Sequence, residues 1–159
     1  MLGQKGLKPL DLIITAKELV GKPGGKPRQS NLKRALSTAY YALFHTLARC
    51  CADVMIGTNS QTKKAWQQVY RALDHNFAKN ACQHGNISRF PLEIQDFANA
   101  FVTLQSKRHS ADYDPYSKIY KSQVLVDLAN AETVIIGIKS APAKHRKAFA
   151  AWVLLKQRP

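Results

Sequence analysis

Residues 105–115 bring together the residue types that phosphate and acid–base chemistry use. Arg108 and His109 are adjacent, and Asp112 and Tyr113 follow within little more than one helical turn. A guanidinium can bind a phosphate through two parallel hydrogen bonds, and a histidine can exchange a proton near neutral pH. A metal-independent ribonuclease needs these groups: a base for the 2′-hydroxyl, an acid for the leaving oxygen and a cation on the phosphate.

Arg108 also continues an apolar stripe on a predicted helix. The stripe recurs at i, i+4, i+7 and i+11 and consists of Phe97, Phe101, Leu104 and Arg108. A guanidinium that faces inward must be paired, and Asp112, one turn later, is the expected partner. His109 lies about 100° further around the helix, so a regular helix does not direct both side chains at one phosphate. This spacing is compatible with a catalytic role for Arg108 and with a purely structural one.

The longest predicted helix spans about residues 30–56, with Ser30 as its N-cap and Gly57 as its end. Its core stripe consists of Leu32, Leu36, Ala39, Tyr40, Leu43, Leu47, Cys50 and Val54. A second stripe, on the opposite side, consists of Arg34, Thr38, Tyr41 and His45. We expect the first face to be buried, while the second is either ordinary surface or a binding surface.

The remaining pattern is helical throughout. Further helices are predicted at about residues 10–20, 66–77, 91 into the 105–115 stretch, 117–140 and 143–157. Arg71 and His75 are expected together on the outer face of the third helix. The basic loop at 21–28 is either a solvated connector or a phosphate-binding loop, although its glycine spacing matches no P-loop.

No alternating run of strand length occurs, which predicts an all-α fold. We expect a single domain over residues 1–159, built as an up-and-down bundle of four to five helices with an added C-terminal helix. The core of this domain is expected at about residues 8–140. A basic amphipathic extension is expected at about residues 142–159.

Two sequence motifs of this chain, and the order in which they occur, are similar to those of one protein family. The run from Arg34 to His45, Arg-Ala-Leu-Ser-Thr-Ala-Tyr-Tyr-Ala-Leu-Phe-His, resembles the second-helix signature of HEPN domains (higher-eukaryote and prokaryote nucleotide-binding). The run from Arg108 to Tyr113 resembles the Arg-x-x-Ala-Asp-Tyr element of a largely uncharacterised bacterial branch. The likeness covers roughly residues 8–140.

The resemblance implies a helical bundle, usually a homodimer, with both motif helices at the dimer cleft. Many members of the family are metal-independent endoribonucleases of toxin–antitoxin, abortive-infection or CRISPR systems. Their active motif is an arginine followed by histidine four to six residues later, whereas here Tyr113 stands at the fifth position after Arg108. Whether this chain is catalytic is therefore left open by the sequence.

The candidate residues follow from both arguments. The candidates for catalysis are Arg108, His109 and His45, and His75 is a further histidine that the chain offers. The candidates for RNA, nucleotide or phosphate binding are Arg34, Tyr41, Arg108, Asp112 and Tyr113. The alternative function is a non-catalytic dimeric module that docks an acidic, nucleotidyltransferase-like antitoxin protein.

Composition agrees with an anionic partner. Lys and Arg number 24 against 10 Asp and Glu, a net charge of +14, which favours association with polyanions or with an acidic protein. The cysteines Cys50, Cys51 and Cys82 lack metal-ligand spacing, and no metal or cofactor is predicted. No signal-peptide pattern and no apolar run of about 18 residues occurs, so we expect a cytoplasmic protein without a membrane span.

Overall fold

The computed structural model describes residues 6–159, which form helices and no strand. The α-helices are α1 (Pro9–Val20), α2 (Gln29–Met55), α3 (Lys63–Ala72), α4 (His75–Gln83), α5 (Leu92–Tyr113), α6 (Lys121–Ile138) and α7 (Ala143–Leu154). Two short 3-10 helices occupy Ser60–Thr62 and Gly85–Arg89. The predicted all-α fold is confirmed. None of the helices in this range is both long and apolar enough to cross a membrane.

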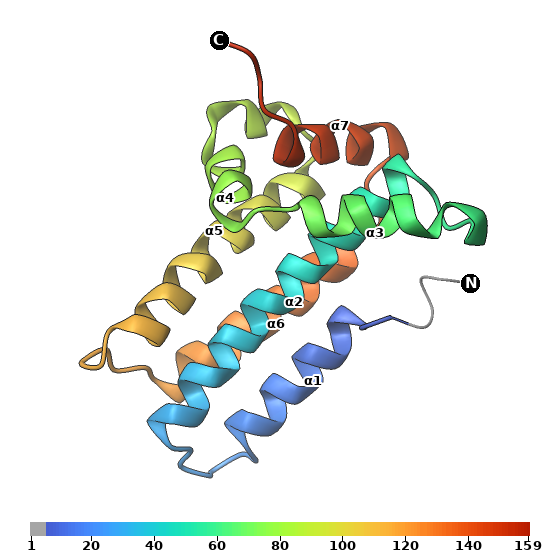
Figure 1. Cartoon of the computed structure of the whole chain (residues 1–159). Helices are drawn as coiled ribbons and strands as arrows, with labels where there is room; N and C mark the ends of the chain where they lie inside the picture. Colours follow the sequence, from blue (N-terminus) through green and yellow to red (C-terminus); the bar gives the residue numbers. More distant parts are fainter. Residues whose placement is uncertain (1–5) are drawn as a thin grey trace.

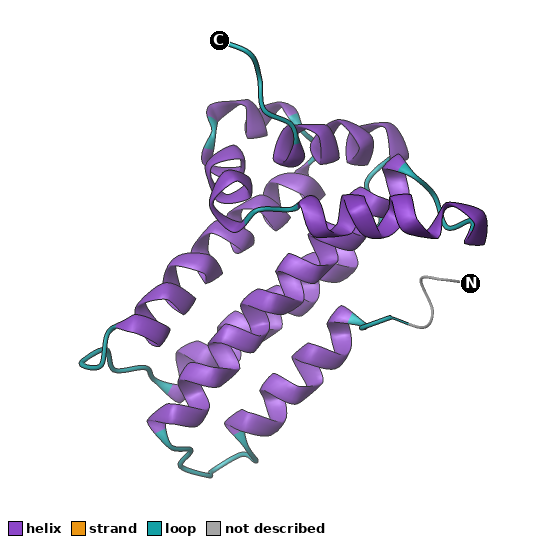
Figure 2. Ribbon diagram, in the orientation of Figure 1, coloured by secondary structure: helices purple, strands orange, loops and turns teal. Residues whose placement is uncertain are grey.

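Four helices form the bundle and three close one of its ends. Helices α1, α2, α5 and α6 run side by side with alternating direction, and α3, α4 and α7 gather at one end (Figure 1). Helix α2 contacts α1, α5, α6 and α7, and short loops join most consecutive helices (Figure 2). Helix α2 is therefore the central element, and any site on it is held by the whole bundle.

The core stripe predicted for α2 is largely confirmed. Its first six members, from Leu32 to Leu47, are buried, whereas Cys50 and Val54 are half-buried where α2 approaches its end. Helix α2 begins at Gln29, with Arg28 in the N-cap position, so Ser30 is not the cap. The helix ends before Gly57, which has a φ of 87°.

The C-terminal helix belongs to the same core. Phe149 and Val153 of α7 are fully buried, and the indole nitrogen of Trp152 donates a hydrogen bond of 2.8 Å to the carbonyl of Ala81 in α4. Helix α7 therefore packs on the bundle and does not project from it.

The helix predicted at 66–77 is two helices. Asp74 interrupts it, because its carboxylate accepts a hydrogen bond of 2.8 Å from the backbone N–H of Phe77 and so caps the start of α4. Arg71 and His75 consequently do not share an outer face. Arg71 is exposed on α3, while His75 turns toward α2.

The two loops at the far end of the bundle are tied to the helices. The Gln29 side chain donates to the carbonyl of Ile119 (2.7 Å) and accepts from its N–H (2.9 Å), so residues 117–120 stay outside the helix and α6 starts at Lys121, not at 117. The Lys121 ammonium donates to the carbonyls of Lys22 and Gly25 in the basic loop. These contacts favour the connector interpretation of the basic loop.

A paired charge joins α5 to α6. The Lys107 ammonium donates to both carboxylate oxygens of Asp127, at 2.8 and 3.0 Å, and the Asp127 side chain is only 9% exposed. With Lys107 directed at α6, the next residue, Arg108, is directed at α2.

We expect Asp127→Asn to lower the free energy of unfolding by about 1–3 kcal/mol, because Lys107 loses its charged partner in a largely buried position. Glu132→Gln in the exposed Lys17–Glu132 pair of the same helix serves as the control and should cost less than about 0.5 kcal/mol. Urea unfolding measures both values. Equal losses in the two variants would contradict a specific role for the Lys107–Asp127 pair.

Candidate functional site

The Arg108 guanidinium is nearly buried and has few partners. Its side chain is 14% exposed, and its Nη1 lies 3.3 Å from Oδ2 of Asp112, which confirms the predicted ion pair. Its carbon Cζ lies 5.0 Å from the ring centre of Tyr40 and 5.7 Å from that of Tyr41. The Nε atom is buried without a hydrogen-bond partner among the described residues. Within residues 6–159, one of the five N–H donors of this guanidinium forms a side-chain hydrogen bond, the one from Nη1 to Asp112.

The ring of Tyr40 packs under the Arg108 guanidinium. It is fully buried, and its hydroxyl lies 2.6 Å from Nδ1 of His75. Burial raises the pKa of the Tyr40 hydroxyl well above its usual range, an effect that the nearby Arg108 charge only partly opposes. The hydroxyl therefore stays protonated, and the direction of its hydrogen bond with Nδ1 depends on the tautomer of His75.

His75 is held from two sides. Its ring stacks on Phe44 with ring centres 4.0 Å apart, in addition to the hydrogen bond with Tyr40. Burial lowers the pKa of His75, and the positive charge of Arg108 lowers it further. Sequence reasoning did not place His75 here, because the apolar spacing of 66–77 continues across the break at Asp74.

His45 lies one turn after Tyr41 on α2 and is also engaged. Its Nδ1 lies 2.5 Å from the hydroxyl of Tyr70, and burial together with the charge of Arg49 lowers its pKa. His45 and His75 are therefore both neutral at pH 7, as a general base must be.

His109 lies apart from this cluster. It is exposed, and its ring packs on Tyr113, with ring centres 4.8 Å apart. Helix α5 stays regular up to Tyr113, so it does not unwind before Pro115 to redirect His109 toward Arg108. Within one chain, Arg108 and His109 do not converge on a common position.

Of the residues predicted to bind phosphate, four form one surface. Tyr41 and Asp112 contact Arg108, and Arg34, exposed on α2, lines a shallow depression together with Asp112. We call Arg34, Tyr41, Arg108 and Asp112 the Arg108 face. Tyr113, at the end of α5, is exposed next to His109.

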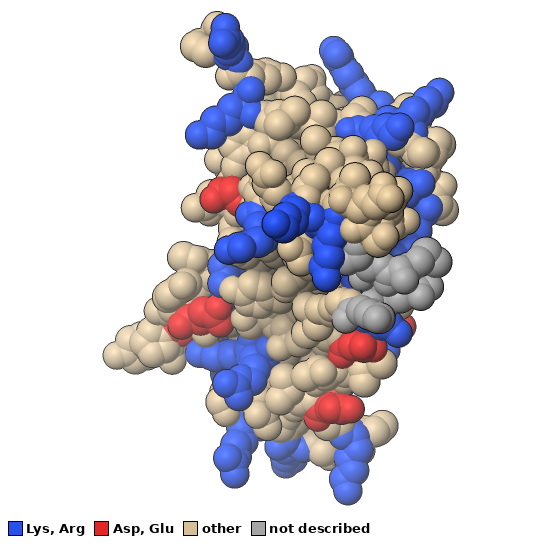
Figure 3. All heavy atoms as spheres, turned by 45° about the vertical axis from the view of Figure 1, so that its right-hand side comes forward, with Lys and Arg blue, Asp and Glu red and all other residues tan. Residues whose placement is uncertain are grey.

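The wider surface is basic, and the site contains no metal-ligand cluster. Lys and Arg outnumber Asp and Glu over the whole visible surface in Figure 3. Within residues 6–159, no three His, Cys, Asp or Glu side chains are placed to hold a metal ion. No protein family, curated protein or solved structure matches this chain. The chemistry of the site therefore rests on its geometry alone.

The lowered pKa of His75 predicts a specific pH dependence of stability. Below the ordinary histidine pKa of about 6.5 the unfolded chain takes up a proton at His75 more readily than the folded chain does. The free energy of unfolding should therefore decrease as the pH falls below about 6.5, until the lower folded pKa is reached. Replacement by an uncharged side chain, in His75→Gln, should make this decrease smaller.

Urea unfolding of both proteins at several pH values between 7.5 and 5 measures the difference. His109→Gln removes a histidine with an exposed ring and serves as the control. An identical pH dependence in the wild type and in His75→Gln would contradict the burial of a neutral His75.

Proposed function

We propose that this chain is a HEPN-like protein that binds RNA or a nucleotide through the Arg108 face. The observation that supports this proposal is the state of Arg108: its side chain is 14% exposed, and within residues 6–159 it forms one ion pair and leaves Nε without a partner. A phosphate offers several acceptor oxygens to such a fork and would satisfy donors that the folded chain leaves unused.

The neighbours of Arg108 suit a nucleic acid. Tyr41 is exposed beside the guanidinium and offers a ring on which a base can stack. Arg34 adds a second positive charge on the same side of α2, where a neighbouring phosphate of an RNA strand would lie. The net charge of +14 increases the rate of encounter with any polyanion.

We further propose that the protein acts as a homodimer in a toxin–antitoxin or defence setting. This part of the proposal rests on the resemblance of the Arg34–His45 and Arg108–Tyr113 motifs to HEPN domains. A two-fold axis near the Arg108 face would bring two copies of Arg108 and Tyr41 into one basic cleft. The cleft would then hold a strand with several phosphates.

Binding of a fluorescein-labelled single-stranded RNA of mixed sequence, followed by anisotropy at physiological salt, tests the proposal. Arg108→Gln should weaken binding at least about tenfold, because a charge-assisted contact with phosphate is lost. Arg89→Gln removes the same charge from an exposed position near the opposite end of α5 and should change the affinity less than about twofold. Equal affinities of the two variants would contradict the Arg108 face and favour a diffuse basic surface that docks an acidic protein.

A second candidate, metal-independent cleavage of the bound RNA, is favoured by one observation. His75, which is neutral at pH 7, is bonded to the hydroxyl of Tyr40, and Arg108 lies over the ring of the same residue. A base and a cation that can bind phosphate are therefore both in contact with Tyr40. His75 suits this role better than the predicted His109, whose exposed ring packs on Tyr113, and than His45, whose pKa is lowered by burial and by the charge of Arg49, and not by that of Arg108.

Incubation of the same RNA with the protein in EDTA tests this candidate. We expect cleavage that falls more than about 100-fold in Arg108→Gln and in His75→Gln, while His109→Gln retains it. Absence of cleavage by the wild-type protein would remove the catalytic candidate and leave RNA binding as the proposed function.

A further inference from the structure

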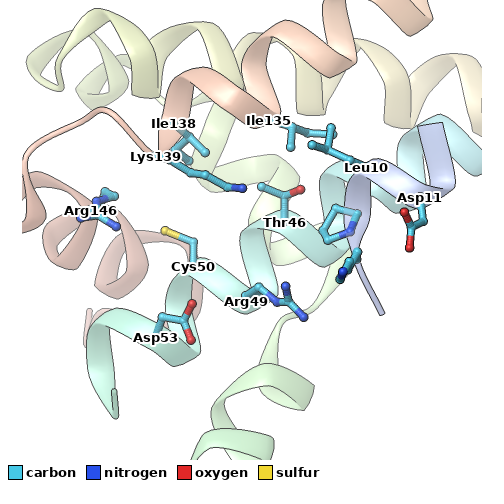
Figure 4. Close-up of a pocket in the computed structure, with 12 residues that line it drawn as sticks. Leu10, Asp11, Thr46, Arg49, Cys50, Asp53, Ile135, Ile138, Lys139 and Arg146 are labelled. Atoms are coloured by element: carbon cyan, nitrogen blue, oxygen red, sulfur yellow. The ribbon is translucent and has the colours of Figure 1, made fainter. Parts of the chain in front are cut away.

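A cavity of about 490 Å³ lies where α1, α2, α6 and α7 meet, and it shares no residue with the Arg108 face. Its volume falls within the range of sites for small organic molecules. Figure 4 shows its lining, with Thr46, Arg49, Cys50 and Asp53 of α2 along one wall.

One side of the cavity is apolar. Leu10 of α1 and Ile135 and Ile138 of α6 lie next to one another along this side (Figure 4). Cys50 lines the wall from α2, and burial raises the pKa of its thiol to about 11 against the opposing charge of Arg146, so the thiol is neutral. This side would accommodate the apolar body of a ligand.

The remainder of the lining is cationic and poorly neutralised. Four basic side chains, from four different segments, contribute to it: Lys8, Arg49, Lys139 and Arg146. None of them forms an ion pair with an acidic residue in the range 6–159. Of the two carboxylates that line the cavity, Asp53 accepts a hydrogen bond of 2.8 Å from the indole nitrogen of Trp66. The cavity therefore carries an excess of positive charge.

Arg49 provides a second, independent sign of a missing acceptor. Its Nη2 donates to the backbone carbonyl of Leu7 at 3.0 Å, while its Nε is buried with no partner in the described part of the chain. A buried donor without an acceptor costs free energy that an acceptor atom would recover. The same guanidinium lies at the cavity wall (Figure 4).

From this combination we infer that the cavity binds a small amphipathic organic anion. Its phosphate or carboxylate head lies at Arg49, Lys139 and Arg146, and its apolar body lies against Leu10, Ile135 and Ile138. A charged head satisfies the guanidinium donors, and the apolar body of the ligand leaves water when it lies against this side of the cavity. The inference uses no residue of the Arg108 face and does not depend on the proposed RNA binding.

Octyl phosphate, octanoate and octanol, each below its micelle concentration, are the probes. Trp66 is the reporter, because its indole is bonded to Asp53 in the cavity wall, and the Trp152→Phe background removes the other tryptophan. We expect a saturable change in Trp66 fluorescence, with octyl phosphate bound at least about tenfold more tightly than octanol. Octanoate distinguishes a preference for phosphate from a preference for any anion.

Arg49→Gln should weaken octyl phosphate binding at least about tenfold and leave octanol binding nearly unchanged. If Arg49→Gln unfolds the chain, Lys139→Gln tests the inference instead, because Lys139 is exposed and its replacement should not affect folding. We expect Lys139→Gln to weaken octyl phosphate binding about two- to fivefold, which is about the size of one surface charge interaction. Lys147→Gln, exposed on α7 outside the cavity lining, is the matched control. The inference would be overturned if the protein bound octyl phosphate and octanol with equal affinity. It would also be overturned if Lys139→Gln and Lys147→Gln weakened octyl phosphate binding equally.

Discussion

The contact between Tyr40 and Arg108 joins the parts of this protein that its proposed function requires. Tyr40 is the largest fully buried side chain, and its ring lies against Phe101 and under the Arg108 guanidinium, while its hydroxyl is bonded to His75. Helices α2, α4 and α5 therefore meet at one residue. The position of Arg108 depends on this contact, because the aromatic ring offers a cation a surface where few polar partners exist.

The energetic balance at Arg108 differs from that of an ordinary structural arginine. A buried guanidinium normally satisfies its donors with carboxylates and carbonyls, because unpaired buried charge is costly. Among the residues that the structure describes, Arg108 has one carboxylate at 3.3 Å and two aromatic neighbours, and its buried Nε has no acceptor. We interpret this incomplete pairing as a site that a ligand completes, and Arg49 has the same unpartnered Nε at the cavity where α1, α2, α6 and α7 meet.

Local sequence patterns predicted the features that depend on neighbours along the chain. Helical spacing identified the buried face of α2 and the inward direction of Arg108, and one-turn spacing identified Asp112 as its partner. The break at Asp74 was missed, because the apolar residues on both sides of it keep helical spacing and only the capping carboxylate signals the interruption. The roles of His75 and of the Arg49 cavity were not predictable, because they depend on contacts between segments far apart in sequence.

The central claim is that the Arg108 guanidinium is a phosphate-binding group, and the ¹H–¹⁵N resonance of its Nε–H reports on it directly. Titration of the ¹⁵N-labelled protein with adenosine 5′-monophosphate, and separately with adenosine, compares two ligands that differ only by the phosphate. The account predicts a saturable shift of the Arg108 resonance, assigned by its loss in Arg108→Lys, with the monophosphate and little or no shift with the nucleoside. An unmoved Arg108 resonance at a monophosphate concentration that saturates other resonances of the protein would contradict the account.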